Sequence, residues 1–410
     1  MMKPFARLFG LILVLVANLS IAEQGLVPQV PSGLDREFAR ILGEAGVPGG
    51  AYVVVHGDRI VQASTHGVRV NGEPDPVTID TVFRLASVSK TFAAQLTGLL
   101  VHEGVLGWEE AVVDHVPELK FATPGYARQL RIHHLLGQST GVVPNAYDNL
   151  LNASQGLDQI LPRFAELEPM CAPGSCYTYQ NVLFSLVGPT IERSTGFTYE
   201  ELLVSRVLEP LGMRRASVGL AGYQAATDRA SPHVRARGSW WPTEVNENYY
   251  RVAPAAGVNA SAMDLGQWLI AQLGHRPDVI APTAIGQLTE KQVRTARDLR
   301  RRGWRDLLSD AHYGLGWRVY TIGDEELYLH SGWVQGFVAE VAYSRDRQIG
   351  LAVLLNAESS AMNEFTTGFW KQVLAEPMIT TRLVDGAPES GEAGQGGAPA
   401  ATTTSPSSPQ

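Results

Sequence analysis

Strand-forming segments lie near both ends of this chain and enclose a long region of helical character. Residues 51–56 and 59–65 are β-branched runs separated by Gly57-Asp58, a pattern that predicts a hairpin. Four more strands with short connections are predicted towards the other end, at residues 316–322, 326–330, 337–344 and 349–355. Between these groups, from Ser87 to about Gln292, apolar residues recur mostly at helical spacing.

This order predicts an α+β fold in which both ends of the chain build one antiparallel sheet and a mainly helical part is inserted between them. Terminal helices are expected to flank the sheet, because residues 34–42 and 362–373 each carry an apolar stripe. We expect the sheet part at about residues 34–86 and 313–376, and the helical part at about residues 87–300. A cleft is expected at the seam between the two parts.

The two ends of the chain differ in composition from the rest. Lys3 and Arg7 precede an apolar run and small residues, which indicates a signal peptide over residues 1–22. The run is shorter than the about 20 residues of a membrane span, so we expect an exported protein, periplasmic or secreted, without stable membrane insertion. An uncleaved anchor is the alternative. Residues 385–410 are small and polar and predict a disordered tail, which leaves a catalytic domain at 23–384.

Composition excludes one class of partner. The 410 residues are 45% apolar and 18% charged, with a formal net charge of −8. Because no long basic run is present, we expect no nucleic-acid partner.

Cys171 and Cys176 are the two cysteines of the chain. In an exported protein such a pair favours a small-loop disulfide, and Pro173 and Gly174 supply the turn that the loop needs. A metal site is the alternative, but two thiolates are half of a structural zinc set and no helical histidine pair accompanies them. We therefore expect neither a metal nor a cofactor.

Ser87 and Lys90 lie three residues apart where a helix is predicted to begin. This spacing places both side chains on one face of the helix, so a neutral lysine can take the proton of the serine hydroxyl. The helix start would stabilise negative charge that develops on a substrate oxygen. The alternative is a helix cap beside a solvated charge, which is the commoner role of an isolated Ser-x-x-Lys.

Two further segments carry polar groups that suit a cleft. Tyr179 and Asn181 lie in a predicted loop, where residues two apart point the same way, although Asn181 is equally suited to cap the next helix. The segment His330-Ser331-Gly332 is predicted to end a strand, and its glycine would let a substrate lie close to the backbone. An ordinary strand end is the alternative there.

Taken together, these three segments resemble the active-site elements of the serine β-lactamase and penicillin-binding protein family, in its class C-like branch with Tyr-x-Asn. The likeness spans about residues 34–374. Three supporting phrases also resemble that branch, at residues 134–141, 257–261 and 313–317.

The resemblance implies acyl transfer through a covalent ester on Ser87. Ser87 would be the nucleophile, and Lys90 and Tyr179 would share its proton and pass it to the leaving group. Asn181 would hydrogen-bond the amide of the substrate, and the segment formed by His330, Ser331 and Gly332 would also bind the substrate. The backbone N–H groups of Ser87 and Trp333 would form the oxyanion hole.

His330 departs from the lysine that class C β-lactamases usually carry in the third element. A histidine is mostly neutral above about pH 6.5, so an anionic substrate anchored by His330 would bind more weakly between about pH 6 and 8. We rank β-lactam hydrolysis first, an activity that fits antibiotic resistance, and carboxylesterase or D-amino-acid peptidase activity on cell-wall peptides second. A penicillin-binding or sensor domain that does not turn over is the alternative of another class. A monomer is expected.

A rival nucleophile is Ser139 in the Gly-x-Ser-x-Gly pattern of residues 137–141, which is typical of α/β-hydrolases. That pattern requires a turn from a strand into a helix, whereas residues 132–136 look helical. We therefore predict that Ser139→Ala leaves activity largely intact.

Overall fold

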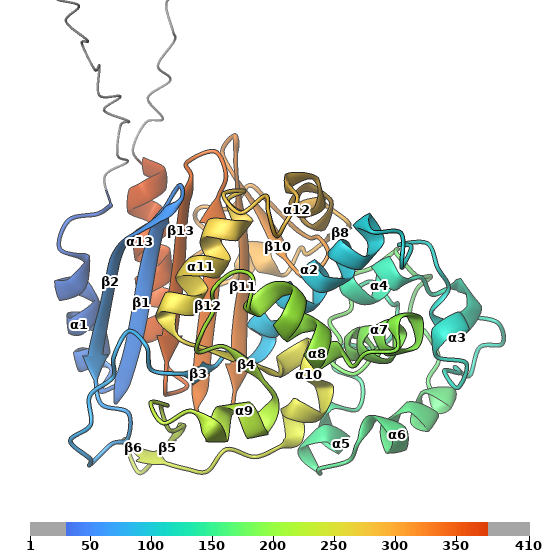
Figure 1. Cartoon of the computed structure of the whole chain (residues 1–410), viewed down its shortest axis with the longest axis horizontal. Helices are drawn as coiled ribbons and strands as arrows, with labels where there is room; N and C mark the ends of the chain where they lie inside the picture. The colour runs from blue at the N-terminus through green and yellow to red at the C-terminus, as the bar shows by residue number, and fades with distance from the viewer. Residues whose placement is uncertain (1–29, 376–410) are drawn as a thin grey trace, which may run out of the picture. The chain divides into compact units, whose positions relative to one another are not determined.

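A central antiparallel sheet organises the fold of this protein, seen in a computed structural model that describes residues 30–375 (Figure 1). The segments predicted as signal peptide and tail lie outside the described residues. The sheet has eight strands in the order β2-β1-β13-β12-β11-β10-β9-β8. Its strands are β1 (Gly49–His56), β2 (Arg59–Gly67), β8 (Val293–Arg294), β9 (Asp310–Tyr313), β10 (Arg318–Ile322), β11 (Glu325–Val334), β12 (Phe337–Ser344) and β13 (Ile349–Leu355).

The two ends of the chain meet inside this sheet, as predicted. Strand β1 pairs with β2 through the Gly57-Asp58 turn and with β13 on its other side, where Val53 lies opposite Ala352. Both β1 and β13 are almost entirely buried, which explains their β-branched composition. The α+β fold with an antiparallel sheet is therefore confirmed.

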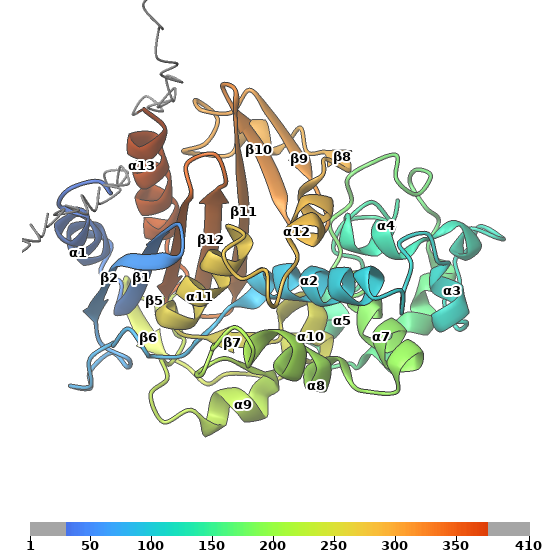
Figure 2. The same ribbon diagram turned by 45° about the horizontal axis from the view of Figure 1, so that its top comes forward.

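Helices α1 (Leu34–Glu44) and α13 (Ala361–Ala375) cover one face of the sheet (Figure 2). Their apolar stripes meet at Phe38, Tyr52 and Phe365, whose ring centroids lie 4.8 to 5.2 Å apart. This aromatic cluster joins the first helix, the first strand and the last described helix.

The opposite face carries α11 and the helical part of the chain (Figure 2). The capping boxes predicted at Thr198 with Glu201 and at Ser261 with Asp264 are both formed, and they begin α8 and α11. The helices of this part are α2 (Ser89–His102), α3 (Val112–His115), α4 (Ile132–Leu136), α5 (Asp148–Asn152), α6 (Leu157–Ile160), α7 (Val187–Thr195), α8 (Tyr199–Leu203), α9 (Gly219–Ala225), α10 (Ala253–Ala256), α11 (Ala262–Gln272) and α12 (Pro282–Thr289).

Two small sheets accompany the main sheet. One joins β3 (Phe83–Arg84), β7 (Val258–Ala260) and β4 (Ser217–Val218), and the other is the hairpin β5 (His233–Ala236) with β6 (Ser239–Pro242). Strand β3 leads directly into a 3₁₀ turn, η1 (Ala86–Val88), and then into α2.

The structure differs from the sequence expectations at the later strands. Strand β11 continues to Val334, so His330 lies inside a strand and not at its end. Strands β8 and β9 were not predicted, because they are short and lie at the edge of the sheet beside the charged stretch around Asp298 to Asp310. The second group of sheet strands therefore begins at Val293, earlier in the chain than the predicted residue 313.

Candidate active site

Ser87 lies at the seam between the sheet and the helical part, in the 3₁₀ turn that precedes α2. The residue before it, Ala86, has φ 48°, a left-handed conformation that is strained for a residue with a side chain. This bend lets the chain pass from β3 into α2 while the side chain of Ser87 stays partly exposed. Backbone strain of this kind is typical of functional positions.

Lys90 is fully buried in the first turn of α2, next to Ser87. Its Nζ lies 3.3 Å from Ser87 Oγ, 2.7 Å from Asn181 Oδ1 and 3.1 Å from the carbonyl oxygen of Ala255. The sequence predicted the contact with the serine, and the structure adds two acceptors from distant parts of the chain.

Burial lowers the pKa of Lys90 to about 7, because the charged form loses its hydration. The carboxyl of Asp148 acts in the opposite direction, and the guanidinium of Arg318 lowers the pKa further. Near neutral pH a large fraction of Lys90 is therefore unprotonated and can accept a proton.

Asn181 connects this lysine to an acidic group that the sequence analysis missed. Its Nδ2 donates to Asp148 Oδ2 at 2.7 Å, while its Oδ1 accepts from Lys90. Burial raises the pKa of Asp148, and the hydrogen bond from Asn181 lowers it. Asn181 therefore holds its side chain in the site and does not cap a helix.

Tyr179 lies on the other side of Lys90, whose Nζ is 4.8 Å from the centre of the phenol ring. Burial raises the pKa of Tyr179 to about 12, and the neighbouring Ser87 hydroxyl acts in the opposite direction. Its carbonyl oxygen accepts from the N–H of Asn145, so the segment that precedes Asp148 and α5 is tied to the loop of Tyr179. Tyr179 and Asn181 face the same side, as the spacing predicted.

His330 is buried within β11 and has 1% of its surface exposed. Its Nε2 lies 2.9 Å from the hydroxyl of Tyr313, and its Nδ1 lies 3.0 Å from the carbonyl oxygen of Ser331. Burial, followed by the positive charges of Arg318 and Lys90, holds the pKa of His330 well below its usual range. His330 is therefore neutral between pH 6 and 8.

Gly332 lets the backbone of β11 approach Ser87 closely. A Cβ atom at this position would lie 2.1 Å from the carbonyl oxygen of Leu85 and 3.0 Å from the backbone nitrogen of Ser87. Only glycine fits, and its backbone lies against the turn that carries the serine. This contact brings the N–H groups expected to form an oxyanion hole, those of Ser87 and Trp333, onto adjacent segments.

The hydroxyl of Ser331 is engaged inside the protein. It donates to Glu340 Oε2 at 2.6 Å and accepts from Arg301 Nη2 at 3.0 Å, while Arg301 and Glu340 form an ion pair of 3.2 Å. Glu340 is 1% exposed, so the ion pair fixes β11 beside the site.

Arg318 is the positive charge that the sequence analysis did not identify. It begins β10, pairs with Asp298, and lies 5.9 Å from the ring of Tyr177 and 5.8 Å from the ring of Tyr313. It acts on both Lys90 and His330 through its charge. In the sequence, Arg318 directly follows the phrase at residues 313–317 that resembles the family, and this position could have identified it.

Ser139 occupies a supporting position. It follows α4, as the sequence predicted, and is 3% exposed. Its carbonyl oxygen accepts from the N–H of Gly174, and the side chain of Gln138 bonds to both backbone groups of Gln180. This segment therefore holds the loop of Tyr179 in place.

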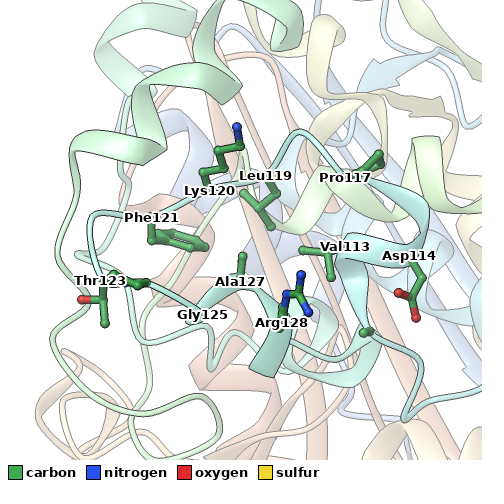
Figure 3. Close-up of a pocket in the computed structure, with 12 residues that line it drawn as sticks. Val113, Asp114, Pro117, Leu119, Lys120, Phe121, Thr123, Gly125, Ala127 and Arg128 are labelled. Atoms are coloured by element: carbon green, nitrogen blue, oxygen red, sulfur yellow. The ribbon is translucent and has the colours of Figure 1, made fainter.

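The predicted disulfide between Cys171 and Cys176 is present in the same loop. Among residues 30–375, no cluster of three or more His, Cys, Asp or Glu side chains is arranged to hold a metal ion. A hollow of about 650 Å³ formed by residues 111–128, with Lys120 and Arg128 on its walls, shares none of the residues of this site (Figure 3).

Two solved structures show which class of fold this chain has. The fold is similar to that of an octameric penicillin-binding protein homologue from Pyrococcus abyssi, with a TM-score of 0.74 and 22% identity over 84% of this chain and 77% of that chain. It is also similar to a class C β-lactamase from Rhodobacter sphaeroides, with a TM-score of 0.69 and 22% identity over 83% of this chain and 99% of that chain. The fold is thus that of β-lactamases and penicillin-binding proteins.

The family model described as Beta-lactamase matches residues 34–374, so this chain belongs to the Beta-lactamase family. Curated relatives include penicillin-binding protein 4 of Amycolatopsis lactamdurans, 28% identical over 88% of this chain and 97% of the relative. Protein flp of Staphylococcus aureus strain MW2 is 24% identical over 85% of this chain and 67% of the relative. The predicted family is confirmed.

The oligomeric state of this protein stays a prediction. The octameric neighbour gives no support to the expected monomer. Within residues 30–375, no helix has the length and apolar character to cross a membrane.

Proposed function

We propose that this protein is a serine hydrolase that opens β-lactams through an ester on Ser87. One observation carries the proposal: the Nζ of Lys90 is buried, has a pKa of about 7 and lies 3.3 Å from Ser87 Oγ. A lysine in this state can remove the serine proton near neutral pH.

The partners of Lys90 give the proton transfer a direction. Asn181 Oδ1 and the carbonyl oxygen of Ala255 can only accept hydrogen bonds, so the two N–H groups of a neutral Lys90 amine donate to them. The lone pair that remains then faces the hydroxyl of Ser87. In this state the serine donates its hydrogen bond to the lysine and is ready for attack.

Acylation follows from this arrangement. Ser87 Oγ attacks the carbonyl carbon of the substrate as its proton moves to Lys90, and the carbonyl oxygen gains a negative charge. The N–H groups of Ser87 and Trp333 stabilise that charge. The carbon–nitrogen bond then breaks, and the nitrogen takes its proton from Lys90 through Tyr179. In the second step Lys90 takes a proton from water as the water oxygen attacks the ester carbonyl carbon. The bond from that carbon to Ser87 Oγ then breaks, the acid product leaves, and the proton passes from Lys90 to Ser87 Oγ.

Arg318 is the proposed anchor of a substrate carboxylate. The neutral His330 cannot supply the charge of the lysine found in class C β-lactamases. Arg318 lies 5.8 Å from the ring of Tyr313, whose hydroxyl is 2.9 Å from His330, and so brings a positive charge to the same part of the site. Because Arg318 is partly neutralised by Asp298, a weaker anchor than a free cation is expected.

A second candidate function follows from the neutral state of His330. A segment His330-Ser331-Gly332 without a positive charge favours substrates without a carboxylate, so carboxylesterase or D-amino-acid peptidase activity is the alternative. A penicillin-binding domain that holds the ester without releasing it is the third possibility, and it uses the same acylation step. Export to the periplasm remains our prediction for all three.

Mass spectrometry of the protein mixed with a penicillin or a carbapenem, sampled from seconds to hours, tests this proposal. An adduct on Ser87 that disappears as hydrolysed drug accumulates is expected, and Ser87→Ala should give no adduct. A lasting adduct would indicate a penicillin-binding role. If neither drug forms an adduct, the β-lactam assignment fails, and p-nitrophenyl esters and D-peptides become the substrates to assay.

A further inference from the structure

Arginine is concentrated in one short segment of this acidic chain. Residues 294–305 contain six arginines and one aspartate, a formal net charge of +5 within a chain of net charge −8. The remaining residues therefore carry a net charge of −13. Most of the segment forms the connection between β8 and β9 at the edge of the main sheet (Figure 2). The protein thus presents a dense positive charge on an acidic background.

Two charged side chains hold this segment on the main sheet. Arg301 donates to Ser331 and pairs with Glu340 at 3.2 Å, so its side chain points into the protein. Asp298 pairs with Arg318 at the start of β10. The single acid of the segment is therefore engaged away from the other arginines.

Two further contacts fix the second half of the segment. Trp304 is 0% exposed, and its ring centre lies 5.4 Å from that of Tyr320. Asn363 of α13 donates to the carbonyl oxygen of Arg302 at 2.8 Å. The backbone of the segment is therefore fastened to β10, β12 and α13, and a ligand would not have to order it.

Three of the arginines are left without a partner. Arg297, Arg300 and Arg302 are exposed, and within residues 30–375 their guanidinium groups form neither an ion pair nor a hydrogen bond. We call these three residues the arginine group. The other two exposed arginines of the segment have acidic neighbours, because Arg294 pairs with Asp310 and Arg305 lies 3.5 Å from Asp306.

The backbone directs the arginine group outward. Arg297 and Arg300 lie three residues apart at the 3₁₀ turn η7 (Asp298–Arg300), where side chains at this spacing lie one above the other. Arg301 has an extended backbone and an inward side chain, and successive side chains of an extended segment point to opposite sides. Arg302 therefore points outward as well, which brings three like charges together on one exposed loop.

The chemistry of the group favours a phosphate ligand. Like charges held close together repel, and an anion that bridges them relieves this repulsion. Guanidinium groups match the oxygens of phosphate in geometry and charge. The free protein therefore carries an unfavourable arrangement that a surface of phosphate groups would make favourable.

The charge of the remaining chain favours a flat surface over a long polymer. A flexible polyanion gains affinity by following positive charge over many contacts, whereas the residues outside this segment have a net charge of −13. A planar array of headgroups can meet one loop alone. The acidic residues further away than about 10 Å are then screened from that surface at about 0.1 M salt.

We propose that the arginine group is a docking surface for the anionic phospholipid headgroups of a membrane. The contact lies at the level of the headgroups and requires no apolar segment to enter the bilayer. This inference goes beyond the proposed function and does not depend on acylation of Ser87.

Vesicle binding tests the docking surface. The protein is mixed with vesicles of phosphatidylcholine alone or with about one third phosphatidylglycerol, and sedimentation gives a partition coefficient for each. Their ratio is the anionic-lipid preference. Arg297→Gln/Arg300→Gln/Arg302→Gln should lower this preference by about 10- to 100-fold, since each arginine near an anionic surface contributes about fivefold. The preference of the wild type should vanish at about 1 M salt, where screening acts within about 3 Å.

Arg59→Gln/Arg128→Gln/Arg214→Gln is the matched control, because it removes the same charge from three exposed arginines in separate parts of the chain. Its anionic-lipid preference should stay close to that of the wild type. Equal losses in the two triple variants would overturn the docking surface, since net charge alone would then govern binding. A wild-type protein without any preference would also overturn it.

A soluble polyanion separates the membrane from a polymer ligand. Double-stranded DNA and heparin take the place of the vesicles in this arm. If the arginine group governs binding to either polymer and not to vesicles, the membrane assignment is wrong. Ser87→Ala should bind vesicles as the wild type does, so the docking surface and the proposed function fail in separate experiments.

Discussion

At the scale of single residues, the site depends on how burial changes the chemistry of ordinary groups. Lys90 would be a cation in water, but inside the protein its pKa falls to about 7. The pKa of His330 is lowered in the same direction by burial and nearby positive charges, which favours its neutral form. In each position the protein thus favours the neutral form of a basic residue, and the consequences can be measured.

The acylation rate should rise with pH through about 7 and level off above it, because only unprotonated Lys90 accepts the serine proton. Asp148 favours the protonated form of Lys90, so Asp148→Asn should move this rise to lower pH and speed acylation at pH 6. Stopped-flow acylation rates measured from pH 5 to 9 test both statements. Asp114→Asn, an exposed acid of the helical part, is the control. If the acylation rate of Asp148→Asn rises at the same pH as that of the wild type, Asp148 does not favour the protonated form of Lys90.

Substrate affinity should not depend on titration of His330 between pH 6 and 8, since burial and the charges of Arg318 and Lys90 hold its pKa well below its usual range. This replaces the sequence-based expectation of weaker binding across that range. Because Lys90 titrates there, the comparison is made between wild type and His330→Gln, whose KM values should follow the same pH profile. A steeper profile in the wild type would show that His330 carries a charge after all.

At the scale of elements, β10 supplies the charge of the site and the loop before Asn181 supplies its shape. Arg318 begins β10 and faces the aromatic rings of Tyr177 and Tyr313. Arg318→Gln should raise KM for a penicillin, an anion, by about 10- to 100-fold through loss of a charged hydrogen bond. A neutral p-nitrophenyl ester should be affected far less. Arg345→Gln, which removes another arginine that packs on an aromatic ring, is the control. Equal effects on both substrates would point to a structural role.

The disulfide stabilises the loop that leads to Tyr179. Closing the short loop between Cys171 and Cys176 should contribute about 2 kcal/mol to the free energy of unfolding. Cys171→Ser/Cys176→Ser is expected to lose that amount in denaturant unfolding. A smaller fall in activity is expected, because hydrogen bonds from Gln138 still hold Gln180. Unchanged stability would mean that the loop is fixed by those bonds alone.

At the scale of the whole molecule, the aromatic cluster of Phe38, Tyr52 and Phe365 fastens both terminal helices to the sheet. Phe365 is 2% exposed, so Phe365→Ala should cost about 3 to 5 kcal/mol of unfolding free energy. Because the cluster lies on the face of the sheet opposite to α2, acylation of Ser87 below the melting temperature should be preserved. Denaturant unfolding beside the acylation assay measures both quantities. A loss below about 1 kcal/mol would show that the helices are held elsewhere.

Local patterns in the sequence were sufficient for much of the fold. The β-branched runs and the Gly57-Asp58 turn placed β1 and β2, and β12 and β13 were predicted with their observed bounds. These signals succeed because they depend on residues close together in the chain. The short edge strand β8 and its short neighbour β9 were not predicted, since their pairing is set by tertiary contacts and not by their own composition.

The sequence by itself determined the chemical groups of the site, because Ser87 and Lys90 are brought together by the spacing of one helix turn. Only the tertiary structure decided their state. The carbonyl oxygen of Ala255 accepts a hydrogen bond directly from Lys90, and Asp148 is connected to Lys90 through Asn181. Arg318, on strand β10, lowers the pKa of Lys90 through its charge. A pKa depends on burial and on charges that are distant in the chain, so neither the poised lysine nor the neutral histidine follows from local sequence.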